Sequence, residues 1–149
     1  MTQNLAEILL LVSVAINAAL LMFIADVLRS VTNDMSEAAF KDFVGSLVRH
    51  STKSPFMIVA LNIPAIGAIP YYYFYGFGDL WISAGLALWL TAGLIAKVLK
   101  LPVYRAIRTV ESHDVVRLAE QRRKLNAGNA LQAVFNLVAA VIMTIAFIR

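Results

Sequence analysis

The distribution of positive charge constrains the fold of this chain more than any other feature. Twelve of its thirteen Lys and Arg residues fall in two segments, about 29–54 and 97–126, and four long apolar stretches flank these segments. Membrane proteins retain Lys and Arg in the loops that stay in the cytoplasm. A chain that crosses a bilayer four times would place both basic segments on one side. The pattern therefore predicts an all-α integral membrane four-helix bundle.

The composition agrees with this class, since 60% of the residues are hydrophobic and only 15% are charged. At roughly 20 residues per crossing, four spans take up most of the chain. The 149 residues then leave no room for a separate soluble domain, and we expect a single transmembrane domain over residues 1–149. The predicted spans cover about 5–28, 55–75, 80–97 and 127–148.

Two segments between the spans are predicted to be amphipathic helices at the cytoplasmic face of the membrane. In the first, about 34–50, Asp34 followed by Glu37 is a capping-box pattern, and apolar residues recur at helical spacing. The second, about 102–125, begins at Pro102 and carries apolar residues on one side. Each combines an apolar face with a charged one, which is typical of interfacial helices.

The charge pattern also predicts an orientation and a location. With both basic segments in the cytoplasm, both termini lie on the other side of the membrane, and we expect a multi-pass protein of the bacterial inner membrane. Glu7 stands where a cleaved signal peptide would have basic residues, so the first apolar stretch is kept as a span. Glu7 is close enough to the far surface that we expect it to be solvated.

The lipid bilayer is the expected partner, and nucleic acid is not, because the cations flank the apolar spans. Anionic lipid headgroups attract such cations. The residues predicted to contact headgroups are Arg105, Arg108, Arg122, Arg123 and Lys124.

Span 2 and span 3 carry features that affect helix packing. Pro64 and Pro70 predict a kinked span 2 whose freed carbonyls are satisfied by neighbouring helices or water. Ser83, Ala87 and Thr91 in span 3 are four residues apart, and small residues at this spacing allow close helix approach. The tyrosine run at 71–75 is typical of an aromatic belt at the membrane surface.

Uncharged amides are the main candidates for a site inside the membrane. Asn129, Gln132 and Asn136 share one stripe of span 4, which we expect to face the bundle interior because polar groups avoid lipid. Asn17 and Asn62 lie at similar depth in spans 1 and 2. Two interpretations remain open: these five amides line a ligand pocket, or they form hydrogen bonds that hold the helices together.

No cofactor is predicted. The chain has no cysteine, and its two histidines, His50 and His113, lie outside the spans without ligand spacing, so we do not expect them to bind haem or a metal. Asp26 is three residues from Arg29 at the end of span 1, and we expect the two to form an ion pair.

Three stretches carry a resemblance to a known family. They are Leu28 through AAFKDFVGSLVR to Ser54-Pro55-Phe56, then LPVYRAI at 101–107, and RRKLNAGNALQAVFNLVAAVIM at 122–143. Together they cover nearly the whole chain, which resembles the small four-helix membrane proteins that include the anthrone oxygenases. The resemblance implies oxidation of a planar aromatic by dioxygen without a recognised cofactor. Where that family has a His and an Arg, this chain has Asn129 and Gln132, which can hydrogen-bond a phenol or quinone but cannot serve as a general base.

Two functional hypotheses follow from the sequence. In the first, the chain binds or oxidises an apolar aromatic ligand in a polar pocket within the membrane. In the second, it is a non-catalytic subunit that assembles with further copies of itself or with a larger membrane complex. A small multidrug transporter is disfavoured because the spans lack a central carboxylate. Whether the chain is an enzyme is left open.

Overall fold

The computed structural model describes residues 2–77 and 79–148, and these residues form helices joined by short turns, without a strand. The all-α class predicted from the sequence is confirmed. In chain order the elements are α1 (Gln3–Phe23), the π-helical turn η1 (Ile24–Leu28), α2 (Arg29–Asn33), α3 (Glu37–Ser51), α4 (Pro55–Tyr75), α5 (Leu80–Ile95), the π-helical turn η2 (Ala96–Lys100), α6 (Leu101–Thr109) and α7 (Val115–Ile145).

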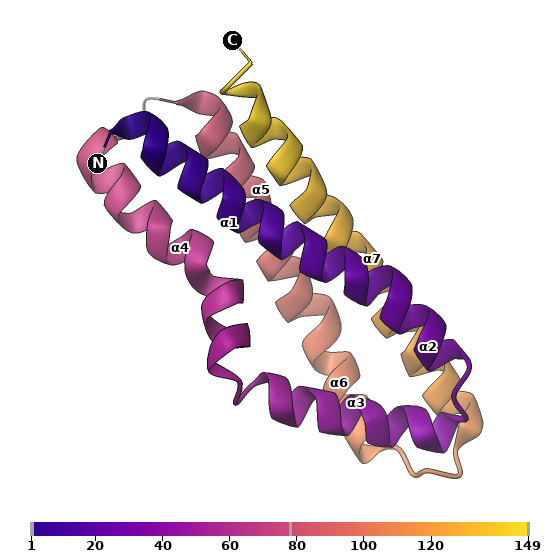
Figure 1. Cartoon of the computed structure of the whole chain (residues 1–149). Helices are drawn as coiled ribbons and strands as arrows, with labels where there is room; N and C mark the ends of the chain where they lie inside the picture. Colours follow the sequence, from indigo (N-terminus) through magenta and orange to yellow (C-terminus); the bar gives the residue numbers. More distant parts are fainter. Residues whose placement is uncertain (1, 78, 149) are drawn as a thin grey trace.

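Four helical runs in the described chain are long and apolar enough to cross a membrane. They lie along the long axis of the molecule, and both chain ends lie toward the same end of it (Figure 1). α3 runs across the opposite end, which we call the α3 end (Figure 1). α7 packs against α5 and α1, and α4 packs chiefly against α1. The four runs are Gln3–Asn33, Pro55–Tyr75, Leu80–Thr109 and Val115–Ile145.

α4 contains Pro64 and Pro70, and a neighbouring helix compensates for the hydrogen bond lost at Pro64. Ser54 caps the helix by accepting a hydrogen bond from the Met57 backbone N–H. Pro64 has no N–H, so the Ala60 carbonyl one turn earlier lacks its usual helical donor. The Asn17 side chain of α1 donates to that carbonyl at 2.6 Å. At Pro64, the predicted satisfaction of a freed carbonyl by a neighbouring helix is therefore confirmed.

α5 and α7 approach each other closely at Gly85. A Cβ added there would lie 2.1 Å from the Met143 side chain and 2.9 Å from the Ala139 carbonyl oxygen, so only glycine fits. The predicted small-residue strip is wrong, because Ala87 and Thr91 are exposed. The buried face of α5 is formed by residues one or two positions from the predicted strip. These are Ile82, Gly85, Leu86 and Ala92.

The single helix predicted over 102–125 is wrong in this form, because a turn at 110–114 divides it. α6 ends at Thr109, and α7 starts at Val115 after Asp114, whose side chain accepts from the Arg117 backbone N–H at 3.1 Å. Each half continues a longer helix instead. α6 extends the run that begins with α5, and residues 115–125 are the first turns of α7.

α3 is held against the bundle at the α3 end. Its Phe40 and Val44 are buried in one core cluster with Val103, Ile107 and Leu125. This part of the apolar face, predicted to meet the membrane interface, instead contacts α6 and α7. Lys41 also donates to the Val110 carbonyl oxygen just after α6, at 2.6 Å. α3 therefore forms part of the protein core at this end.

Candidate functional site

A hollow lies near the α3 end, where α1, α3, α4, η2 and α7 converge. It has a volume of about 720 Å³, and most of its wall is apolar, with Leu21, Phe43, Leu47, Met57 and Leu61 contributing from three helices. Such volumes are ordinary for small-molecule sites, which span roughly 300–1,000 Å³ and are common between the helices of bundles. We call this hollow the α3 cavity.

Polar groups are few in the wall of the α3 cavity, and their charge is of one sign. Three cations line it, Arg29, Lys97 and Lys100, and no Asp or Glu is among the described residues around it. The remaining polar groups are uncharged side chains, including Asn62, Asn129, Gln132, Asn126, Thr32, Ser51, Thr52 and Tyr104. The cavity thus combines an apolar body with a positively charged region.

Lys100 is the most unusual of these cations because it is only 9% exposed. Its ammonium group donates to the Gln132 side-chain oxygen at 2.6 Å. The lysine stem crosses α7 at Gly128, where an added Cβ would lie 2.9 Å from Lys100 Cγ. Glycine at this position therefore lets the lysine lie flat against α7 with its charge inside the protein.

Two π-helical turns border the α3 cavity. Ile24 and Leu28 of η1 line it from one run, and Ala96, Lys97 and Lys100 of η2 line it from another. Pro102, two residues after η2, gives a local cause for the second, since it leaves the Val98 carbonyl without an N–H partner. Single π turns inside α-helices occur frequently at functional sites. Both irregular turns here lie where the bundle is hollow.

The five predicted pocket amides do not share one environment. Asn62, Asn129 and Gln132 line the α3 cavity, whereas Asn17 and Asn136 are not among its described lining residues. Asn17 binds the Ala60 and Ser13 carbonyls, and Asn136 donates to the Gln132 carbonyl at 3.0 Å. Asn17 thus joins α1 to α4, as in the second interpretation, whereas the Asn136 bond lies within α7.

Two amide oxygens are buried without a partner in the described part of the protein, Asn129 Oδ1 and Asn136 Oδ1. Buried polar groups in native proteins are nearly always hydrogen-bonded, so each such atom calls for an explanation. Asn129 lines the α3 cavity, and its Oδ1 accepts no hydrogen bond from a described residue. Asn129 is therefore a polar group at the cavity that is available to a ligand.

The basic residues predicted to contact headgroups separate into two groups. Arg105, Arg108, Arg123 and Lys124 are exposed. The Arg122 side chain is only 10% exposed and pairs with Glu37 at 3.1 Å.

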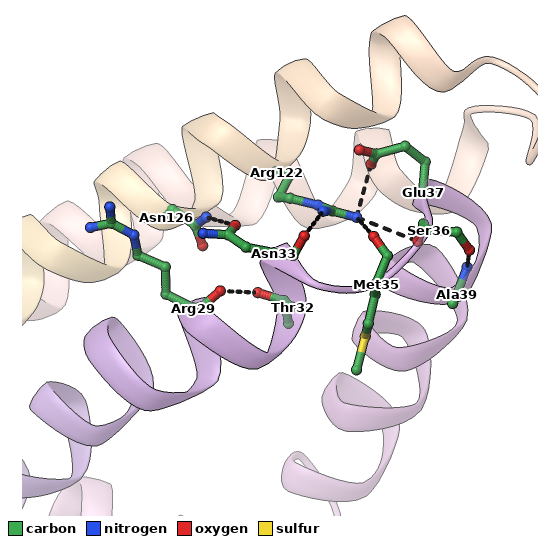
Figure 2. Close-up of polar contacts among 9 residues, drawn as sticks. All are labelled: Arg29, Thr32, Asn33, Met35, Ser36, Glu37, Ala39, Arg122 and Asn126. Atoms are coloured by element: carbon green, nitrogen blue, oxygen red, sulfur yellow. Dashed lines mark hydrogen bonds and ion pairs between the residues drawn. The ribbon is translucent and has the colours of Figure 1, made fainter.

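The guanidinium of Arg122 is occupied by groups of the protein itself. Figure 2 shows it at the turn between α2 and α3, where it donates to the backbone carbonyls of Asn33, Met35 and Ser36. It also lies 4.5 Å from the centre of the Phe40 ring. Arg122 therefore ties α7 to the α2–α3 turn.

Neither histidine lies at the cavity in the described structure. His50 is exposed and its Nδ1 is 2.8 Å from the Ser46 carbonyl oxygen, while His113 lies 3.1 Å from Glu111. No group of three or more His, Cys, Asp or Glu residues in the described chain is placed to hold a metal ion. The predicted Asp26–Arg29 ion pair is not among the pairs formed by the described residues.

The burial of Glu7 and of Lys100 was not predicted from the sequence. Glu7 was expected to be solvated, but it is only 6% exposed and accepts hydrogen bonds from the Tyr71 hydroxyl at 2.9 Å and from Gln3 at 2.8 Å. Tyr71 is therefore a core residue that joins α4 to α1, and not part of a surface belt. Lys100 was counted only among the cations of the second basic segment.

A comparison of the chain with known protein families, curated proteins and solved structures finds no match.

Proposed function

We propose that this chain is a four-span protein of a bacterial inner membrane that takes an apolar or amphipathic molecule from the bilayer into the α3 cavity. The α3 end lies in the cytoplasm in this proposal, and both termini lie on the other side. The twelve Lys and Arg residues of the two basic segments support this orientation, because they belong to the elements that meet at the α3 end.

The observation that carries the proposal is the α3 cavity of about 720 Å³ with its largely apolar wall. At 1.5 Å per residue, a 31-residue run such as Gln3–Asn33 is about 46 Å long, and the hydrocarbon core is about 30 Å thick. The runs other than Pro55–Tyr75 are therefore longer than the hydrocarbon core is thick, and the proposed orientation puts the excess at the α3 end with the basic segments. The cavity would then lie near the boundary between acyl chains and headgroups, where amphipathic molecules concentrate.

Native mass spectrometry of protein purified in a mild detergent tests the proposal. We expect wild-type protein to retain a small molecule, and Gly93→Leu to lose most of it, because Gly93 lines the cavity and an added Cβ there meets no neighbour. Gly45→Leu is the matched control, since Gly45 is also unobstructed and is not among the lining residues. Wild-type protein without any bound molecule, or equal retention by both variants, would contradict the proposal.

The resemblance to the anthrone oxygenases supports a more specific form, in which the bound molecule is a planar aromatic that is oxidised. Phe40, Phe43 and Tyr104 in the cavity wall favour an aromatic ligand. Oxygen uptake with anthrone tests it: we expect uptake with wild-type protein and much less with Gly93→Leu. Equal rates for the two proteins would reject the oxygenase form and leave binding to be judged by mass spectrometry.

The alternative function is that of a non-catalytic subunit. The exposure of α4 supports it. Only 11% of the most apolar window of α4 is buried within the protein, whereas 33% is buried in the corresponding windows of the runs that contain α1 and α7. The same mass spectra distinguish this alternative, because a second copy or another protein would appear as a higher mass that survives purification.

A further inference from the structure

We infer that the ligand of the α3 cavity is an amphiphile with an acidic head group, whose head lies against Lys100 and whose tail lies along the apolar wall. This inference rests on the proposed function, since it requires that the cavity binds a small molecule. It goes further by assigning the charge of the ligand and the residue that neutralises it.

The first observation is the imbalance of charge around the cavity. Arg29, Lys97 and Lys100 line it, with no carboxylate among its described lining residues. None of the three takes part in an ion pair within the described chain, whose pairs involve other residues. Clefts lined by one sign of charge attract ligands of the opposite sign.

The second observation is the burial of Lys100. Its ammonium group has a neutral hydrogen-bond partner, Gln132, and its side chain is almost fully removed from solvent. A buried charge is unfavourable unless an opposite charge compensates for it. A carboxylate or phosphate head beside Lys100 would supply this compensation, and a neutral ligand would not.

The third observation is independent of charge. Asn129 is 8% exposed, lines the same cavity, and has a buried side-chain oxygen, Oδ1, without a hydrogen-bond donor among the described residues. Lys100 binds Gln132, three residues from Asn129 and on the same stripe of α7. An acidic head group bound there could accept hydrogen bonds from the lysine and from Asn129 Nδ2, while Asn129 Oδ1 can accept only from a hydroxyl or N–H of the ligand.

Fluorescence titration with cis-parinaric acid and with its methyl ester tests the inference, because the two probes share one tail and differ in the charge of the head. In a neutral detergent, we expect wild-type protein to bind the acid about tenfold more tightly than the ester, a difference that a single ion pair can supply. Lys100→Gln should lower the affinity for the acid to that for the ester. Lys100→Arg should retain the preference.

Lys53→Gln is the matched control. It removes the same charge from an exposed residue of the α3–α4 turn that is not among the lining residues, so it should leave the preference for the acid unchanged. A loss of preference in Lys53→Gln as large as in Lys100→Gln would show that general surface charge, and not Lys100, selects the probe. That result would overturn the inference.

The titrations separate failure of the inference from failure of the proposed function. Equal affinity of wild-type protein for acid and ester overturns the acidic-head inference but leaves the cavity as a binding site. If neither probe binds although the mass spectra show a retained molecule, the inference fails and the proposed function stands. If the mass spectra also show no retained molecule, both fail.

Competition identifies the source of the acidic head. Displacement of cis-parinaric acid by oleate indicates a fatty acid, and displacement by phosphatidylglycerol alone indicates an anionic phospholipid. Either result supports the inference. Displacement by the neutral oleyl alcohol as effectively as by oleate would overturn it.

Discussion

Arg122 illustrates how the surroundings of a single residue change its role. In the sequence it belongs to a run of three cations, Arg122, Arg123 and Lys124, that resembles a surface basic patch. In the structure, Arg122 reaches the turn between α2 and α3 and contacts three carbonyls, Glu37 and the Phe40 ring, whereas Arg123 is exposed (Figure 2). Helical spacing alone could not distinguish these roles, because the partner turn is more than eighty residues away.

Removal of this buried cation should destabilise the protein strongly. Arg122→Met leaves Glu37 and the carbonyls of the turn without their donor, and breaking a buried ion pair costs about 3–5 kcal/mol. Arg123→Met, one residue away and exposed, should change the free energy of unfolding by no more than about 0.5 kcal/mol. Thermal unfolding followed by circular dichroism in detergent measures both. Similar Tm values for the two variants would refute the assigned role of Arg122.

Asn17 and Pro64 should be energetically coupled through the Ala60 carbonyl. Asn17→Leu removes the donor of that carbonyl and should cost about 1–3 kcal/mol, because the oxygen is left unsatisfied. In a Pro64→Ala background the helix supplies its own N–H, so the same Asn17 substitution should cost less. A double-mutant cycle measured by unfolding should give a coupling of at least about 0.5 kcal/mol. Additive effects would mean that Asn17 does not replace the donor that Pro64 removes.

At the scale of the elements, the sequence predicted the apolar helices well and their contacts poorly. Runs of apolar residues identify α1, α4, α5 and α7 without reference to the rest of the chain. The face that each helix buries depends on its neighbours, so Gly85 and not Ala87 forms the close contact with α7. The turn at 110–114 carried a local signal that could have been used, since Asp114 is a typical N-cap residue.

Gly85→Ala tests the close packing of α5 on α7. The added methyl group would overlap Met143 and the Ala139 carbonyl, and overpacking of this kind costs about 1–3 kcal/mol. Gly93→Ala, in the same helix with open space around it, should be neutral or stabilising by up to about 1 kcal/mol through helix propensity. The two substitutions should therefore shift Tm in opposite directions or by clearly different amounts. Equal shifts would contradict the predicted contact.

For the whole molecule, the even number of long runs places both chain termini at one end of the bundle and α3 at the other (Figure 1). The chain has no cysteine, so a single introduced cysteine reports on one position. In intact cells, a membrane-impermeant maleimide should label Asn4→Cys, and it should label Ser112→Cys only after the membrane is permeabilised. Reversed labelling would contradict the proposed orientation.

The candidate site could be predicted from the sequence only in part. The polar stripe of span 4 led to Asn129 and Gln132, which line the α3 cavity, because polar groups in an apolar helix turn away from lipid. The same reasoning could not separate them from Asn136, whose position relative to the cavity depends on how α7 packs. Lys100 was missed because its burial depends on Gly128 of another helix.

The central claim is that the α3 cavity binds a small molecule inside a four-span bundle, and a crystal structure grown from a lipidic mesophase tests it most directly. We predict continuous elongated density in the cavity, ending beside Lys100, with α3 held across the end of the bundle. A structure in which α4 and α3 close against η2 and α7, leaving no hollow at Lys100, would contradict the account.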